Sequence, residues 1–261
     1  MNFNDFLTNS PHKIEIKELI EISNLAYKNW EIYWSSFISS YKYEEILKEF
    51  AALNDLTYLS FGGYENADRS KIACFRKELQ INEKDVSREF PGKGFEIKGN
   101  FLFDNATQDD FRNTLIEYGI KENQIGDIWT LGERGAQGIL TDNDGLIKLE
   151  KYFLRDVEVK IEIMNISKLR IPAKRIEKVI NTVEASIRID AIASAGFRLS
   201  RNKITDRIKR GSLSLNGVKV QKSTLSIQVG DKIILENKGM IEILEIFKTK
   251  RERWKIKLIR K

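Results

Sequence analysis

The run of residues 188–233 constrains the fold of this chain more than any other. Apolar residues recur at helical spacing from Ile189, and Gly196 is expected to end that first short helix. Ser200 stands where a helix N-cap belongs, and Gly211 follows as a stop signal for a second helix. The run therefore predicts two short consecutive helices, the second of which is bounded at both ends.

The second half of this run predicts a small sheet. Residues with period-two alternation flank Asn216 and Gly217, which is the pattern of a two-residue type I′ hairpin. Residues 225–229 and 232–235 are expected to form a third and a fourth strand. Two helices on a curled sheet make a compact module, and the second helix is cationic wherever it is not apolar. Such a helix face favours phosphate.

Charge is divided unevenly along the chain. From residue 186 onward, 19 Lys and Arg stand against 7 Asp and Glu, a net charge of +12. The remaining 25 basic and 31 acidic residues give −6, so the whole chain carries +6. Each phosphate neutralised by a protein releases counterions, and a segregated basic segment is therefore typical of nucleic-acid binders. The alternative is a solvated basic face without a ligand, and the motifs around it favour RNA.

Four elements of this run resemble the S4 RNA-binding domain. They are Arg188-x-Asp190, Ser200-Arg201, Asn216-Gly217 and Val229-Gly230-Asp231. The resemblance implies a cationic RNA-contacting surface, with Asp190 as the partner that orients a nearby arginine. The residues predicted to bind RNA are Arg188, Arg198, Ser200, Arg201, Lys203, Arg207, Lys209, Arg210 and Lys219.

The rest of the chain predicts an α+β protein. Residues 1–55 are expected to form an N-terminal helical region, because apolar and aromatic residues recur there without glycine. Residues 56–165 are expected to form a domain containing a ferredoxin-like β-α-β-β-α-β unit, whose helices lie at 107–118 and 143–154. Residues 166–185 are predicted to be a linker containing a short strand or helix, and residues 186–261 the S4-type α/β domain.

Two further segments are secondary candidates for RNA contact. Residues 56–75 predict a strand, a glycine turn, a polar loop and a strand, in which Tyr64 can stack on a base and Arg69 can reach phosphate. A plain hairpin turn is an equally good interpretation. A second hairpin, with strands at 240–247 and 254–259, is expected to have a basic tip, for which a solvated turn is the alternative. Its candidate residues are Lys248, Lys250, Arg251 and Arg253.

Taken together with residues 62–69 and 125–128, this organisation resembles the YlmH family over nearly the full length. The resemblance implies a non-enzymatic factor on the large ribosomal subunit that helps to hold a peptidyl-tRNA during rescue of stalled ribosomes. Its RNA partner would be ribosomal RNA, tRNA or both. Residues 132–137 further resemble the cyanobacterial and plastid branch, named photosystem II S4 domain protein. A regulatory or assembly role linked to photosystem II is therefore the alternative.

The sequence argues against enzyme classes. The only histidine, His12, is expected at the surface, and its solitude excludes Ser/His/Asp catalysis. A pseudouridine synthase would need a separate catalytic aspartate, whereas Asp190 already belongs to the S4-like motif. Residues 132–138 lack a phosphate-loop pattern, and residues 142–145 suit a helix cap better than a calcium loop. We expect no catalytic residue, no cofactor and no metal.

Location follows from what the sequence lacks. One cysteine, Cys74, fits a reducing compartment, and there is no apolar run of membrane-spanning length. The expectation is a cytoplasmic protein without membrane insertion.

Overall fold

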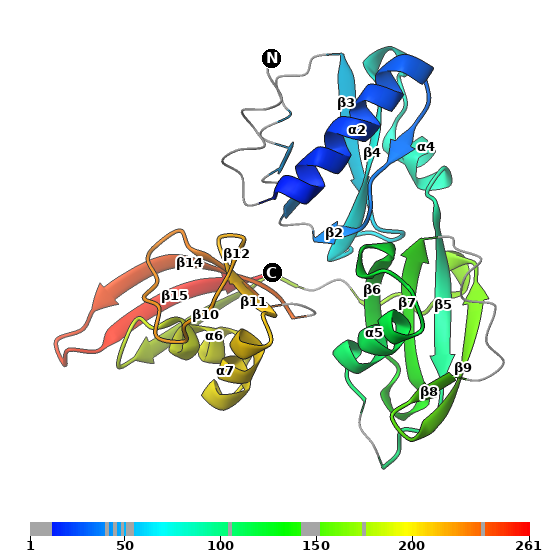
Figure 1. Cartoon of the computed structure of the whole chain (residues 1–261). Helices are drawn as coiled ribbons and strands as arrows, with labels where there is room; N and C mark the ends of the chain where they lie inside the picture. Colours follow the sequence, from blue (N-terminus) through cyan, green and yellow to red (C-terminus); the bar gives the residue numbers. More distant parts are fainter. Residues whose placement is uncertain are drawn as a thin grey trace. The chain divides into compact units, whose positions relative to one another are not determined.

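The computed structural model divides the chain into two compact units, Met1–Ala173 and Lys174–Lys261. Unit 1 is the first of these and unit 2 the second (Figure 1). The described residues are 12–39, 42–43, 46–47, 50, 55–103, 106–141, 152–173, 176–235 and 238–261.

The first part of unit 1 that the structure describes contains helix α2 (Lys13–Asn29) and a sheet centred on β4 (Arg69–Arg76). Strand β3 (Leu56–Phe61) pairs with β4 along its length, and β1 (Tyr33–Trp34) and β2 (Ile38–Ser39) pair with β4 on its other edge. The strand–turn–strand pattern of residues 56–75 is therefore present.

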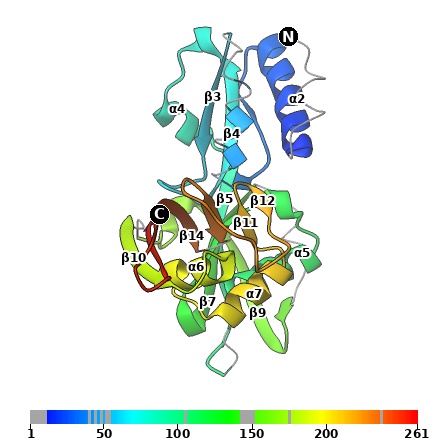
Figure 2. The same ribbon diagram turned by 90° about the vertical axis from the view of Figure 1, so that its left-hand side faces the viewer.

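Strand β4 is buried on both faces because a helix covers each one. Ile72 and Cys74 pack in the same apolar cluster as the buried face of α2. Ala73 and Phe75 alternate with them and pack against Val86 of helix α4 (Glu83–Arg88). Figure 2 shows the two helices on opposite sides of the β3–β4 pair. A central strand so enclosed needs a nearly continuous apolar run.

Two expectations for the N-terminal region were wrong. Residues 33–34 and 38–39 are strands β1 and β2 and not helix, because their backbones bond to β4 and tertiary pairing overrides the helical spacing of their side chains. His12 is only 4% exposed, since it lies immediately before α2, whose inner face is buried. The helical prediction holds for 13–29 and for the described residues 42–43, 46–47 and 50.

The second part of unit 1 is a five-stranded antiparallel sheet in the order β6-β7-β5-β9-β8. The four strands of the expected β-α-β-β-α-β unit are present in it. Helix α5 (Gln108–Glu117), capped by Thr107, follows β5, which is the first of the four along the chain. The strands are β5 (Gly92–Lys98), β6 (Ile125–Thr130), β7 (Gly135–Thr141) and β9 (Val157–Met164).

The second helix of the expected ferredoxin-like unit differs at its end. Residues 152–154 form strand β8 (Tyr152–Leu154), which pairs with β9. Tyr152 and Leu154 are buried while Phe153 is 46% exposed. This alternation of buried and exposed side chains is that of a strand, and it replaces the expected end of the helix. The helix cap at 142–145 and the remainder of that predicted helix fall at 142–151, outside the described residues.

Unit 2 is a six-stranded antiparallel sheet with both of its helices packed on one face (Figure 1). Helices α6 (Ile189–Phe197) and α7 (Arg201–Lys209) bury isoleucines against the sheet. The sheet runs in the order β10-β15-β14-β13-β11-β12. Its strands are β10 (Lys178–Glu184), β11 (Leu213–Leu215), β12 (Val218–Lys219), β13 (Lys232–Leu235), β14 (Gly239–Lys248) and β15 (Trp254–Arg260).

Three details of unit 2 depart from expectation. Gly196 lies inside α6, where a Cβ would come within 2.2 Å of Ile241, so this glycine permits close helix–sheet packing and does not end the helix. Residues 225–229 contain only an isolated bridge between Ser226 and Arg188. The segment 166–185, expected as a linker with a short strand or helix, does contain a strand, but this strand, β10, pairs along its length with β15 and so belongs to the sheet of unit 2.

Candidate nucleic-acid interface

The helix pair α6–α7 is joined by a tight turn that exposes cationic side chains. Arg198 takes a left-handed conformation with φ of 55° at the end of α6, and Ser194 Oγ donates to the Leu199 carbonyl at 2.6 Å. Ser200 then caps α7 by accepting from the Lys203 N–H, as predicted. Arg198, Ser200 and Lys203 are exposed. The turn thus fixes the backbone and leaves the side chains of Arg198 and Lys203 to solvent, while the Ser200 hydroxyl caps α7.

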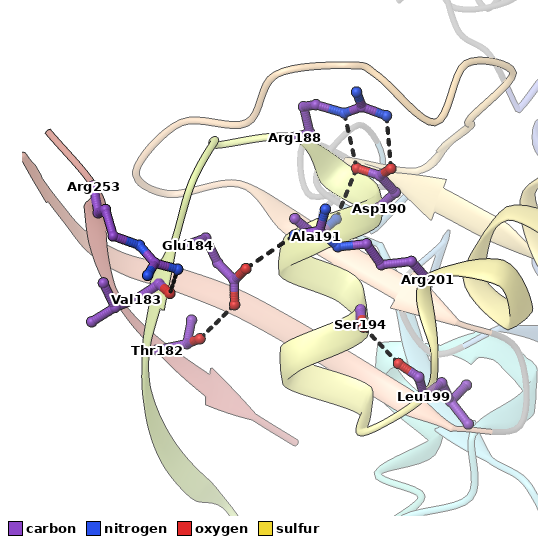
Figure 3. Close-up of polar contacts among 10 residues, drawn as sticks. All are labelled: Thr182, Val183, Glu184, Arg188, Asp190, Ala191, Ser194, Leu199, Arg201 and Arg253. Carbon is purple, nitrogen blue, oxygen red and sulfur yellow. Dashed lines mark hydrogen bonds and ion pairs between the residues drawn. The ribbon is translucent and has the colours of Figure 1, made fainter.

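Arg188 is held by a buried carboxylate at the start of α6. Its Nε and Nη2 donate to the two oxygens of Asp190 at 3.1 and 2.8 Å (Figure 3). The Asp190 side chain is 8% exposed and that of Arg188 is 42% exposed. Asp190 also accepts from the Ala191 N–H. The predicted role of Asp190 as an orienting partner is therefore the one observed, and it leaves part of the guanidinium open.

Two more arginines approach from other elements (Figure 3). Arg201 at the start of α7 donates to Glu184 of β10 at 3.2 Å, and Thr182 Oγ1 donates to the other carboxylate oxygen at 2.7 Å. Arg253, from the turn before β15, donates to the Val183 carbonyl at 3.3 Å. Arginines distant in sequence thus gather around the end of β10.

The remaining primary candidates lie along α7 and beside its C-terminal end. Lys209 and Arg210 are exposed, while Arg207 is half-buried. Gly211 has a positive φ of 71°, and the Lys219 side chain lies close to it. The hairpin therefore brings Lys219 next to the end of α7. Contact of these cations with phosphate stays a prediction.

The basic tip is the turn between β14 and β15. Lys248 is paired with Glu252 at 3.6 Å, and both side chains are largely exposed. Lys250 and Arg251 are exposed. The tip thus offers cations to solvent, and their contact with RNA stays a prediction.

Tyr64 and Arg69 lie in a contact inside unit 1 between the loop at 62–69 and strand β6, which we call the joint. Asp127 of β6 is 6% exposed and accepts from Tyr64 Oη at 2.7 Å and from the backbone N–H groups of Asp68 and Arg69. The Arg69 guanidinium donates to the carbonyls of Ile125, Phe37 and Glu122. The loop 62–69 and the strand at 125–128 therefore meet, which sequence spacing alone did not reveal. RNA contact by Tyr64 or Arg69 stays a prediction.

Burial dominates the electrostatics of this joint. Desolvation, with a further contribution from Asp68, raises the pKa of Asp127 to about 6 despite its three donors. Arg69 partly offsets this rise. The carboxylate is consequently poised to take up a proton in mildly acidic solution.

The glycine-rich run 132–138 is a turn between strands. Gly132–Arg134 form a short 3₁₀ segment, and Gly135 begins β7 with a φ of 120°. A Cβ at Gly135 would lie 1.9 Å from the Ile97 carbonyl oxygen, so only glycine fits. An open depression of about 530 Å³ beside the turn mixes glutamates with cations, including Glu133 and Arg134. That lining does not make a cationic cradle for a nucleotide phosphate.

Two positions of the site were not anticipated. Glu184 holds Arg201 from a segment interpreted as a linker, and Asp127 organises the joint in unit 1. A signal existed only for Asp127, whose carboxylate interrupts an otherwise apolar strand next to Gly126. Among the described residues, no group of three or more His, Cys, Asp or Glu side chains could hold a metal ion. None of the helices described combines the length and apolar character needed to cross a bilayer.

Family models match both ends of the chain. The model of the YlmH N-terminal region matches residues 12–79, and that of the C-terminal domain of mitochondrial transcription rescue factor 1 matches residues 174–256. The second match begins where unit 2 begins. Ribosome-associated protein quality control protein P2 of Bacillus subtilis (strain 168) is 24% identical over 243 residues, which is 92% of each chain. These findings support a relationship to the YlmH family.

Two further similarities are partial. Mitochondrial transcription rescue factor 1 of Mus musculus is 40% identical over 68 residues, which is 25% of this chain and 27% of that protein. The solved structure of cell division protein ylmH from Streptococcus pneumoniae aligns with a TM-score of 0.42 at 18% identity, covering 59% of this chain and 90% of that one. The resemblance of residues 132–137 to the photosynthetic branch stays a prediction.

Proposed function

We propose that this chain is a non-enzymatic RNA-binding factor that associates with the ribosome in protein quality control. The observation that carries the proposal is the gathering of Arg188, Arg201 and Arg253 from separate elements of unit 2 (Figure 3). Support comes also from the similarity over 92% of both chains to a protein named for ribosome-associated quality control.

The chemistry of this surface suits phosphate. A guanidinium stays charged and grips phosphate oxygens through two parallel donors. Arg188 is held through Nε and one Nη by Asp190, so its remaining donors face solvent while its orientation is fixed. Cationic contacts of this kind position an RNA without specifying its sequence. We infer recognition of a folded RNA by shape and charge.

The RNA we infer is ribosomal RNA, tRNA or both, on the large ribosomal subunit in the cytoplasm. Segregated charge favours such a partner, since the segment from residue 186 carries +12 against −6 for the rest. A factor that helps to retain peptidyl-tRNA on a stalled subunit needs this kind of surface and no catalytic group.

The test combines crosslinking in cells with sucrose-gradient sedimentation. The full chain is expected to crosslink to large-subunit ribosomal RNA or tRNA and to sediment with large subunits. The variant Arg201→Ala/Arg207→Ala should lose most of both signals and show a shallower salt dependence of RNA binding. The matched control is Arg88→Ala on α4, an arginine of unit 1 that is 78% exposed. Parent-like binding by the double variant at every salt concentration would contradict the proposed surface.

A further inference from the structure

The sheet face of unit 2 opposite α6 and α7 carries an exposed aromatic side chain. Phe247 on β14 is 57% exposed, while Ile246 before it packs into the helix-covered core. No helix among the described residues of unit 2 covers this second face, which we name the open face. The ring therefore lies on a face that the helices leave uncovered and is available for stacking.

Strand register places Phe247 in a row with two other side chains. Lys255 of β15 is the cross-strand partner of both Phe247 and Val183. Val183 is 47% exposed, and Lys255 is exposed. The row is therefore apolar at both ends with a cation between them. Val179 and Ile259 form a parallel row on the same face.

The charges of the open face leave it cationic. Its two carboxylates, Glu242 and Glu245, are paired with Lys261 at 3.2 Å and with Lys257 at 3.0 Å. Lys255 makes no ion pair with any residue in the described part of the chain. The basic tip begins with the residue after Phe247, so the aromatic ring lies at the edge of that cationic turn.

We propose that the open face binds an unpaired RNA base, which stacks on Phe247 while Lys255 and the basic tip contact the flanking phosphates. This inference rests on the proposed RNA-binding function and deepens it by adding single-stranded recognition to the helix surface. Aromatic rings interleaved with cations on an uncovered sheet suit single-stranded RNA, because every base offers a ring to stack. A protein partner would have to bury Lys255 in an apolar row, whereas a phosphate neutralises it.

The test measures binding of the full chain to fluorescently labelled adenosine and uridine decamers and to an RNA duplex. Phe247→Leu keeps the apolar volume but removes the aromatic ring, so decamer affinity should fall roughly fivefold to twentyfold. Phe247→Trp should restore it. Duplex affinity should not change, because paired bases are not available for stacking. The control is Leu225→Ala, which changes an exposed apolar residue of unit 2 that lies outside the named strands.

Salt dependence separates the two roles within the row. Lys255→Ala should flatten the slope of log affinity against log salt by about 0.7, the value for one phosphate on a single strand. Phe247→Leu should leave this slope unchanged. A lysine that contacts no phosphate would leave the slope as it is and would contradict the inference.

The inference and the proposed function fail in different ways. Loss of RNA binding in Arg201→Ala/Arg207→Ala together with parent-like decamer binding in Phe247→Leu would overturn this inference alone. Parent-like binding by both would overturn both. If Phe247→Leu binds every RNA normally but no longer sediments with ribosomes, the open face docks a protein and the inference is wrong.

Discussion

Two of the buried aspartates, one from each unit, organise their surroundings in opposite ways. Asp127 in unit 1 and Asp190 in unit 2 are each 6% exposed. The donors to Asp127 are a tyrosine hydroxyl and two backbone N–H groups, which all belong to the joint itself. Asp190 instead grips the guanidinium of Arg188, which remains 42% exposed. The Asp127 carboxylate thus holds together groups inside unit 1, whereas the Asp190 carboxylate orients a cation that remains exposed to solvent.

The two aspartates differ in the role of the arginine beside them. The Arg69 guanidinium near Asp127 donates to backbone carbonyls, whereas the Arg188 guanidinium bound to Asp190 keeps donors available for a ligand. Burial of a carboxylate is therefore a poor guide to function, while exposure of the group that it holds is a better one.

The largest expected effect is on the stability of unit 1. Asp127→Ala leaves Tyr64 Oη and two buried N–H groups without their acceptor, and we expect a loss of about 4 kcal/mol in the free energy of unfolding. Asp190→Ala should cost about 1 kcal/mol, because the exposed Arg188 rehydrates. Hydrogen exchange read by mass spectrometry reports each unit separately. Equal losses for the two variants would erase the contrast.

The pH dependence of unit 1 should follow Asp127. Its folded pKa of about 6 lies above the ordinary value of 3.8, so between these values the folded chain keeps a proton that the unfolded chain releases. Stability should consequently fall as pH rises from about 4 to 6, by up to about 3 kcal/mol. Denaturant titrations across this range measure the effect. Asp127→Asn should remove the slope, and an unchanged slope would assign it to another group.

These contrasts were only partly predictable from sequence. The type I′ hairpin was foreseen because its cause is local, and Asn216 and Gly217 indeed both have positive φ, at 49° and 81°. The Ser200 cap and the pairing of Asp190 with Arg188 likewise span only a few residues.

Contacts between distant segments were missed. Glu184 reaches Arg201 only because β10 joins the sheet of unit 2, and no spacing in the sequence encodes that neighbour. The two-residue strands β1 and β2 exist through pairing with β4, although the aromatic and apolar residues between Trp30 and Ile38 repeat at helical spacing. Local chemistry thus sets turns and caps, whereas sheet neighbours arise from tertiary packing.

RNA binding should respond to Asp190 more than stability does. Asp190→Asn keeps the shape but removes the charge that fixes Arg188, so we expect a loss of roughly fivefold in RNA affinity, while the free energy of unfolding changes by less than about 1 kcal/mol. Fluorescence anisotropy with a tRNA-like hairpin measures the affinity. Arg188→Ala should give a similar loss, and the double variant should lose little more, because both changes act through one guanidinium.

The smallest expected effect has the opposite sign and concerns Glu184. This carboxylate contacts Arg201 through one oxygen at 3.2 Å, so it orients the guanidinium weakly but competes with phosphate for it. Glu184→Gln retains an acceptor for Thr182 and removes the competing charge, and RNA affinity should rise about twofold at low salt. The matched control is Glu78→Gln in unit 1, where a similar single contact to Arg76 spans 3.4 Å. Weaker binding by Glu184→Gln would mean that Glu184, like Asp190, is an orienting group.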